Sequence, residues 1–335
     1  MFDKQVSPSR IMQLATGYWD SAALLAANEL QLFDAIGQYA VSAEDMTIKL
    51  IADLRGLSMI LDACVGLGLL IKGDDGRYSN SPEALAFLVK GSPAYLGDAL
   101  RWSADQYPLW GKLANSVQAG TPAKEPSVHL GDDPDQTRTF VMAMHNRAKG
   151  IARVVTAFID LSESKKLLDI GGGPGTYSVL LAQKYPELEV TLLELPAVAA
   201  IAIELISASG LQDRVATING SAVEDQFGVS EYDSILISGV LHQMAPSTIQ
   251  NIFVKARLAL KPGGKIFISD VMLNSDKTQP VFSTLFSLQM LLTSNAGAVF
   301  SVDECKEWLE MAGFGNIQSQ KLPEPLPYVL VVANS

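Results

Sequence analysis

Residues 165–196 read KKLLDIGGGPGTYSVLLAQKYPELEVTLLELP, and this stretch decides the fold. Residues 167–170 are a short apolar run, typical of a buried parallel strand, and a glycine-rich segment follows them directly. Residues 176–184 have the pattern of a helix, and residues 190–193 that of a second strand ending at Glu194. The stretch therefore predicts a β-α-β unit with a glycine-rich first turn and an acid at the end of its second strand.

The glycine-rich turn predicts a site for a positively charged nucleoside cofactor. Its glycines, Gly171, Gly173 and Gly175, let the backbone turn tightly and let a ligand approach the main chain. Glu194 can accept hydrogen bonds from two ribose hydroxyls, whereas the carboxylate of Asp169 would repel a pyrophosphate and attract a cation. S-adenosylmethionine, which carries a sulfonium and an ammonium group, meets these requirements. The alternative is a structural turn, because such turns also join strands to helices without a ligand.

The composition is that of an acidic, well-packed protein. The chain has 335 residues, of which 48% are hydrophobic and 18% charged, and this length favours two domains. Its net charge of −11 argues against nucleic-acid binding, which needs a basic surface. We find neither an apolar run long enough to span a membrane nor a signal peptide, so we expect a cytoplasmic protein. The scattered Cys64 and Cys305 and a total of three histidines predict that no metal is bound.

We expect residues 1–155 to form a helical dimerisation domain. Residues 11–40 have apolar side chains at helical spacing, and residues 22–36 are apolar on more than one face. A helix of this kind must be buried on several sides. A homodimer would provide the second partner, and a large monomeric core is the alternative.

A winged-helix unit is expected at about residues 40–90. Ser42 can cap its first helix, residues 58–67 predict a second helix with Met59 among its buried residues, and a turn at 73–76 closes a hairpin. Winged helices often bind DNA. However, residues 58–70, which include the second helix, carry no lysine or arginine for phosphate contacts, so we expect a structural or dimerisation role instead.

Residues 156–335 continue the alternation of strands and helices. We expect further strands at residues 215–219, 232–238, 265–271 and 329–333. Residues 261–264, KPGG, predict a turn. Because ligands bind outside the carboxyl ends of the strands in such sheets, the functional residues should lie at these ends.

Two side chains near these strand ends suggest proton transfer. His242 lies shortly after the strand that ends at Ser238, where a neutral histidine could take a proton from a substrate hydroxyl. Asp270, at the end of the next strand, could hold the other ring nitrogen and stabilise the imidazolium. The alternative is that His242 caps a loop and Asp270 caps a strand.

Nearly the whole chain resembles the plant-type, class II, caffeate O-methyltransferase-like family of small-molecule O-methyltransferases and its bacterial relatives that act on pigments and antibiotics. The resemblance is carried by residues 167–196, by SGVLHQM at 238–244, by LKPGGKIFISD at 260–270 and by EWLEMAGF at 307–314. It implies a Rossmann-like S-adenosylmethionine methyltransferase domain behind an all-α and winged-helix dimerisation domain. S-adenosylhomocysteine would be the spent cofactor.

The resemblance also implies roles for single residues. His242 would be the catalytic base and Asp270 its partner acid. The residues implied for the cofactor are Asp169, Gly171, Gly173, Gly175, Glu194, Leu195, Gly220, Ser221, Ala222 and Ser238. From the apolar segments we expect a pocket for a flat, hydroxylated acceptor, built from Trp102, Met144, Phe286 and Met290, although such Met- and Phe-rich helices belong to a protein core more often than to a pocket.

Several positions depart from the family pattern. The family commonly reads His-Asp-Trp-x-Asp, whereas residues 242–246 read HQMAP. Ser221 stands where an Asp normally meets the adenine region, and Ser238 where many members have Lys. Residues 297–300 lack the further acid of the plant members.

The hypothesis favoured by the sequence is methyl transfer from S-adenosylmethionine to a hydroxyl of a small, largely apolar aromatic or polyketide-like molecule. Methylation at carbon or nitrogen stays open. A second class of function keeps the fold and the cofactor but catalyses hydroxylation, decarboxylation or a pericyclic reaction, and the departures around His242 motivate it. A third is a winged-helix regulator, against which the acidic net charge argues.

Overall fold

Contacts within the chain divide it into two units, Met1–Gln106 and Tyr107–Ser335, in a computed structural model that describes residues 6–324 and 326–335. The division falls earlier than the boundary after residue 155 expected from the sequence. Helix α9 (Pro134–Ala157) packs on the sheet of the second unit, where Ala152 and Val155 are fully buried in one apolar cluster with Leu167. No helix within the described ranges is long and apolar enough to cross a membrane.

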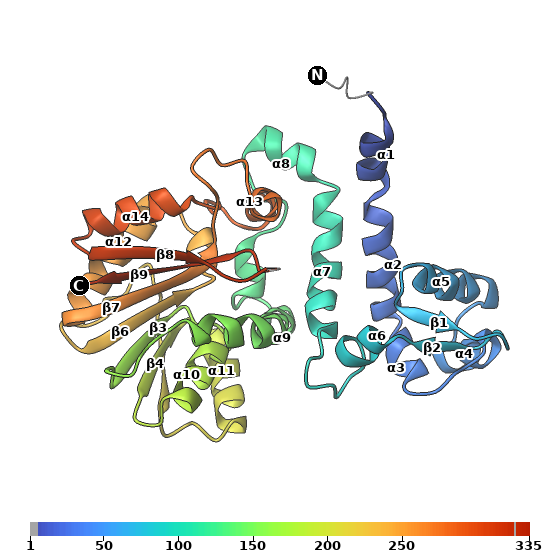
Figure 1. Ribbon diagram of the computed structural model, residues 1–335, viewed down its shortest axis with the longest axis horizontal. Coiled ribbons are helices and arrows are strands. Elements are labelled where there is room, and N and C mark those ends of the chain that lie inside the picture. Colours follow the sequence, from blue (N-terminus) through green and yellow to red (C-terminus); the bar gives the residue numbers. More distant parts are fainter. Residues whose placement is uncertain (1–5, 325) are drawn as a thin grey trace. The chain divides into compact units, whose positions relative to one another are not determined.

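The first unit is helical apart from one hairpin (Figure 1). The expected helix over residues 11–40 is three helices, and the left-handed φ of 55° at Gln31 separates the second from the third. The elements are α1 (Ser9–Thr16), α2 (Tyr18–Glu29), α3 (Leu32–Ile36), α4 (Ala43–Leu50), α5 (Leu54–Gly66), β1 (Leu70–Lys72), β2 (Tyr78–Asn80), α6 (Pro82–Phe87) and α7 (Gly97–Trp110), whose last turn enters the second unit.

The winged-helix unit forms, with two differences from the expectation. Ser42 Oγ accepts a hydrogen bond from the N–H three residues later and so begins α4. Helix α5 begins earlier than expected because Asp53 accepts a hydrogen bond from the N–H of Gly56. The prediction that Met59 is buried is wrong: its side chain is 56% exposed, and the buried side of α5 carries Leu57, Leu61 and Cys64.

Apolar side chains of α1 and α2 are exposed in the single chain. Ile11, Leu14 and Trp19 are 69%, 64% and 60% exposed, and no residue of α1 is buried. A surface of this kind is typical of a segment that is covered by a partner.

The second unit holds one seven-stranded sheet with the order β5-β4-β3-β6-β7-β9-β8. Strands β3 to β7 are parallel, whereas β9 pairs antiparallel with both β7 and β8. The strand order reverses between β3 and β6, which is where such sheets bind ligands. The strands are β3 (Lys166–Ile170), β4 (Glu189–Glu194), β5 (Val215–Asn219), β6 (Tyr232–Ser238), β7 (Leu260–Val271), β8 (Gly315–Lys321) and β9 (Tyr328–Asn334).

Two of these strands differ from the expectation. Residues 261–264 form no separate turn but bulge out of β7, because Tyr232 pairs with Leu260 and Ser234 already pairs with Lys265. Strand β8 was not expected at all. It lies at the sheet edge with mostly exposed, polar residues, so it lacks the apolar alternation that predicts a strand.

Helices cover both faces of the sheet (Figure 1). Neighbouring residues of β3 point to opposite faces: Leu167 belongs to the apolar cluster that includes Leu181 of α10, and Leu168 to the cluster that includes Phe253 of α12. Besides α9, the helices of this unit are α8 (Leu113–Ala119), α10 (Thr176–Lys184), α11 (Pro196–Ala208), α12 (Pro246–Ala259), α13 (Val281–Thr293), α14 (Val302–Met311) and the short 3-10 helices η1 (Pro126–His129) and η2 (Leu241–Gln243).

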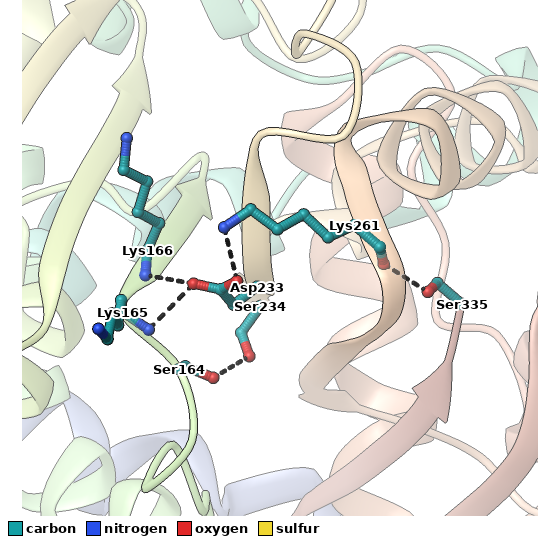
Figure 2. A network of polar contacts seen from close by, with 7 residues as sticks. All are labelled: Ser164, Lys165, Lys166, Asp233, Ser234, Lys261 and Ser335. Atoms are coloured by element: carbon teal, nitrogen blue, oxygen red, sulfur yellow. Dashed lines mark hydrogen bonds and ion pairs between the residues drawn. The ribbon is translucent and has the colours of Figure 1, made fainter.

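A polar network fixes the amino ends of three central strands (Figure 2). Asp233 Oδ2 accepts hydrogen bonds from the N–H groups of Lys165 (3.0 Å) and Lys166 (2.8 Å), and its Oδ1 lies 2.7 Å from Lys261 Nζ. Burial of Asp233 opposes ionisation, but the Lys261 ammonium and the two N–H donors together lower the pKa of its carboxyl. The network ties β3, β6 and β7 together at the end of the sheet opposite the predicted site.

Candidate active site

The glycine-rich turn joins β3 to α10. Gly171, Gly173 and Gly175 have φ angles of 65°, 57° and 72°, a region that favours glycine. A Cβ at Gly171 would lie 3.0 Å from Val240, and one at Gly175 would lie 3.2 Å from Ile206, so both glycines allow close packing. A Cβ at Gly173 would meet no atom of the described residues within 4 Å. The turn therefore has an open side at Gly173, where a ligand can approach the main chain.

Glu194, at the end of β4, holds this turn. Its Oε2 accepts a hydrogen bond from the N–H of Gly173 at 2.7 Å, and its Oε1 accepts one from the N–H of Leu195 at 2.7 Å. Burial raises the pKa of Glu194, and the two N–H donors oppose this shift. Each carboxylate oxygen accepts one bond and keeps a second lone pair, so Glu194 can still accept hydrogen bonds from two hydroxyls.

Asp169 lies directly beneath the turn and is fully buried. Its Oδ2 accepts a 2.6 Å hydrogen bond from Ser178 Oγ, whereas its Oδ1 has no partner among the described residues. Burial raises the pKa of Asp169 to about 7, the Ser178 hydroxyl opposes the shift, and the charge of Glu194 adds to it. A buried carboxylate oxygen without a donor is suited to a nearby cation. The site therefore fits a positively charged nucleoside cofactor such as S-adenosylmethionine.

A second turn, after β5, lies beside Glu194. The N–H of Gly220 donates to the carbonyl of Glu194 at 2.9 Å, and a Cβ at Gly220 would lie 2.8 Å from Leu193 Cδ1. Ser221 and Ala222 follow and are half-buried. The fold thus brings the turns after β3 and β5 together at one residue, Glu194, through its carboxylate and its main-chain carbonyl.

His242 lies on η2, after the end of β6, and is 7% exposed. Its Nδ1 is 2.6 Å from Asp270 Oδ1, which also accepts a hydrogen bond from the N–H of Val271 at 2.8 Å. Asp270 is fully buried, and its Oδ2 has no partner within the described ranges. A carboxylate at Nδ1 selects the tautomer of the neutral imidazole that carries its proton on Nδ1, which leaves Nε2 able to accept a proton.

Two segments pack against His242. The ring of Phe286, on α13, meets the imidazole edge-to-face with 4.9 Å between the ring centres. Behind the histidine, a Cβ at Gly297 would lie 2.6 Å from the carbonyl oxygen of His242 and 3.0 Å from Gln243 Cα. The chain after α13 therefore passes so close to His242 that only a glycine fits at position 297.

The remaining predicted residues are placed as follows. Ser238 is the last residue of β6 and is half-buried. Of the expected acceptor pocket, Phe286 contacts His242, Met290 is 7% exposed on α13, and Met144 is half-buried on α9. Trp102, on α7, belongs to the first unit.

Sequence reasoning missed several residues that shape the site. These are Ser178, Lys255 and Gly297. A lysine inside the apolar pattern of residues 246–259 is a signal that could have found the second of these, whereas nothing in the sequence distinguishes Gly297 from other loop glycines. In the part of the chain that the structure describes, no group of three or more His, Cys, Asp or Glu side chains could hold a metal ion.

Comparison with known proteins gives matches over most of the chain. Residues 110–315 match the O-methyltransferase domain and residues 12–90 the O-methyltransferase dimerisation domain. The chain is 31% identical to a 3-hydroxy-5-methyl-1-naphthoate 3-O-methyltransferase of Streptomyces sahachiroi, over 95% of this chain and 92% of that protein. It is 30% identical to the N,N-dimethyltransferase OxyT of Streptomyces rimosus, over 96% and 95%.

A solved structure shares the whole fold. Human N-acetylserotonin methyltransferase in complex with S-adenosylmethionine superimposes with a TM-score of 0.89 at 25% identity, over 100% of this chain and 99% of that chain. The helical first unit agrees with the dimerisation domain and supports a homodimer, and the second unit has the methyltransferase fold. The chain belongs to the plant-type, class II family of S-adenosylmethionine-dependent O-methyltransferases.

Proposed function

We propose that this enzyme methylates a hydroxyl of a small, largely apolar aromatic or polyketide-like molecule, with His242 as the general base and Asp270 as its partner. The observation that carries the proposal is the buried 2.6 Å contact between His242 Nδ1 and Asp270 Oδ1 at the carboxyl edge of the sheet. When bound, S-adenosylmethionine supplies a methyl group on a sulfonium, which an oxygen anion can attack.

We further propose that the two glycine-containing turns and their acids hold the cofactor. Glu194 would accept hydrogen bonds from the ribose hydroxyls, and the buried Asp169 would stabilise the positive end of the molecule. The other proposed contacts are Gly171, Gly173, Gly175, Leu195, Gly220, Ser221, Ala222 and Ser238. The open side of Gly173 and the Asp169 Oδ1 atom, which has no partner among the described residues, support this assignment.

In the proposed mechanism, His242 takes the proton of the acceptor hydroxyl at Nε2. The carboxylate of Asp270 then stabilises the imidazolium, and it does so strongly because both side chains are buried. The Phe286 ring packs edge-to-face with the imidazole, and the close approach of Gly297 restricts the backbone of His242. A base of this kind accounts for roughly a hundredfold to ten-thousandfold of the rate.

The apolar character of the acceptor is inferred from the surroundings of His242. Phe286, which touches the imidazole, also packs against a cluster of Val271, Leu273 and Val299 together with Tyr328. Such a wall favours a flat, apolar ring over a charged molecule. The relative from Streptomyces sahachiroi is named for a hydroxynaphthoate, an aromatic acceptor with a hydroxyl group.

The proposal is tested by incubating the enzyme and its His242→Gln variant with S-adenosylmethionine and a panel of phenols and hydroxynaphthoates. We expect methyl ethers, detected by mass spectrometry, to form with the unaltered enzyme and to form at least about a hundredfold more slowly with the variant. An unchanged rate in the variant would show that His242 is not the base.

A second candidate is methylation of an amine, which the similarity to OxyT favours. A neutral amine attacks through its own lone pair, so its reaction needs little help from a base. Paired acceptors that differ only in a hydroxyl or an amino group distinguish the two candidates. Turnover of the amino compound alone, with little effect of His242→Gln, would replace the first proposal by the second.

A further inference from the structure

Lys255, on α12, is a buried lysine whose side chain is directed at a single turn. It is 4% exposed, and its Nζ donates to the carbonyl oxygens of Ala222 (2.7 Å), Val223 (3.0 Å) and Asp225 (2.8 Å). The ammonium also lies 4.6 Å from the centre of the Phe227 ring. An ammonium has three donors, so all of them serve the turn that follows β5.

The same turn is fixed by its own side chains. Asp225 Oδ2 accepts a 2.7 Å hydrogen bond from the N–H of Ser221, and the N–H of Asp225 donates to the carbonyl of Ser221 at 3.0 Å. Ser221 Oγ accepts hydrogen bonds from the N–H groups of Val223 (3.2 Å) and Glu224 (3.3 Å). The hydroxyl of Ser221 is therefore used inside the turn.

These contacts leave one main-chain donor of the turn available. Of the N–H groups of residues 221–225, only that of Ala222 has no acceptor among the described residues. Gly220 joins the turn to the carbonyl of Glu194. A flat heterocycle next to a ribose at Glu194 could thus meet a fixed N–H donor, although no acidic side chain stands at position 221.

We propose that Lys255 is a positioning residue for the cofactor: its three hydrogen bonds hold residues 220–225 in the shape that accepts the adenine ring of S-adenosylmethionine. This inference rests on the proposed cofactor site. Lys255 acts through the turn, because its ammonium is fully engaged with carbonyl oxygens. Without it, three carbonyl groups lose their donor, and the turn can relax to other conformations that no longer match the ring.

The test compares Lys255→Met with Arg257→Met. Arg257 lies on the same helix and donates to the carbonyl of Gly313, away from the turn, so its variant loses the same charge and one hydrogen bond to a carbonyl oxygen. We expect Lys255→Met to weaken S-adenosylhomocysteine binding by about tenfold or more in calorimetric titration, and Arg257→Met to leave it unchanged. The KM for S-adenosylmethionine should rise with kcat nearly constant, which loss of folded protein alone would not produce.

Two further variants keep the result interpretable. Asp225→Ala removes the exposed carboxylate that accepts the N–H of Ser221, so it loosens the turn while Lys255 stays in place. We expect this variant to weaken binding as well, and it provides the test if Lys255→Met does not fold. Glu194→Ala reports on the cofactor site itself. If Glu194→Ala loses binding while folded Lys255→Met and Asp225→Ala bind as the unaltered enzyme does, the role of Lys255 is wrong and the cofactor site stands. Unchanged binding in all three variants would overturn both.

Discussion

His242 Nδ1 lies 2.6 Å from Asp270 Oδ1, and the two side chains are only 9% and 1% exposed. The segment after β6 and the end of β7 are therefore joined by a polar contact that water hardly reaches. Asp270 Oδ1 also accepts the N–H of Val271, so the carboxylate is held from the main chain as well. This geometry orients the imidazole before any acceptor binds.

Replacing either partner should slow the chemical step. We expect His242→Gln to lower kcat by roughly a hundredfold to ten-thousandfold, because the acceptor hydroxyl loses its base. Asp270→Asn should also lower kcat, because an amide can donate to Nδ1 and so favours the wrong tautomer. Steady-state kinetics with a phenolic acceptor measure both effects.

The pH dependence provides the control for this prediction. In His242→Gln the rate should rise as the pH passes the pKa of the acceptor itself, since the ionised acceptor needs no base. The affinity for S-adenosylhomocysteine should not change. If Asp270→Asn reacts as fast as the unaltered enzyme, the pair has no role in proton transfer.

Asp169 should make the stability of the ligand-free protein depend on pH. Its carboxyl has a pKa of about 7 when folded and an ordinary value of 3.8, so the folded protein holds this proton where the unfolded chain has lost it. The free energy of unfolding should therefore fall between about pH 4 and pH 7, by roughly 4 kcal/mol at most from this group. Urea denaturation at several pH values measures the slope.

Asp169→Asn isolates this contribution. The amide can still accept the hydrogen bond of Ser178, and the raised pKa of Glu194 acts in both proteins. The variant should lose less stability than the unaltered protein as the pH rises through this window. If the free energy of unfolding has the same slope against pH in both proteins, burial does not raise the pKa of Asp169.

Gly297→Ala should displace His242, the proposed base. The added methyl group would lie 2.6 Å from the carbonyl oxygen of His242, so one of the two segments must move. We expect a roughly tenfold to hundredfold lower kcat with unchanged cofactor affinity. Gly315→Ala is the control, because a Cβ there would meet no atom within 4 Å in the part of the chain that the structure describes. Similar kinetics of the two variants would show that the close approach has no influence on catalysis.

Asp233→Asn should reduce stability and leave catalysis intact. The change weakens the bonds from Lys165 and Lys166 and removes the ion pair with Lys261, at a cost of about 1–3 kcal/mol in the free energy of unfolding. Lys261→Met should cost less, because the two main-chain bonds remain. A loss of kcat at full stability in Asp233→Asn would contradict the separation of this network from the site.

The exposed apolar side chains of α1 and α2 should be needed for dimer formation. The double variant Ile11→Asp, Trp19→Asp places two charges on side chains that are 69% and 60% exposed in the single chain. We expect a shift from dimer to monomer in light scattering, because a buried unpaired charge opposes association. A dimer of unchanged stability would place the interface elsewhere.

Much of the α/β unit could be predicted, because its strands are short apolar runs bounded by glycine or acidic residues. The β-α-β unit around residues 167–194, the parallel strands, and the proximity of His242 to Asp270 follow from this pattern and from the meeting of strand ends at one edge. Strand β8 was not predicted, because an exposed edge strand needs no apolar alternation.

The features that could not be predicted depend on which segments of the chain come close together in the folded protein. Met59 has the same apolar character as Leu61, and only the position of α5 shows that it is exposed. The proposed role of Gly297 depends on a backbone segment that passes close to His242. The proposed role of Lys255 depends on three carbonyl groups that lie 30, 32 and 33 residues away along the chain. Periodicity carries no information on such contacts.

The position of β9 between β7 and β8 also affects how the chain folds during its synthesis. While the chain emerges from the ribosome, β7 can pair with β6 on one side, but its other edge stays open until residues 328–334 have been synthesised. That edge includes the buried Ile266, Phe267 and Ile268, and open apolar edges pair readily with other chains. Termination of synthesis before β9 would therefore lead to aggregation of the nascent chain, because no later segment could take the place of that strand.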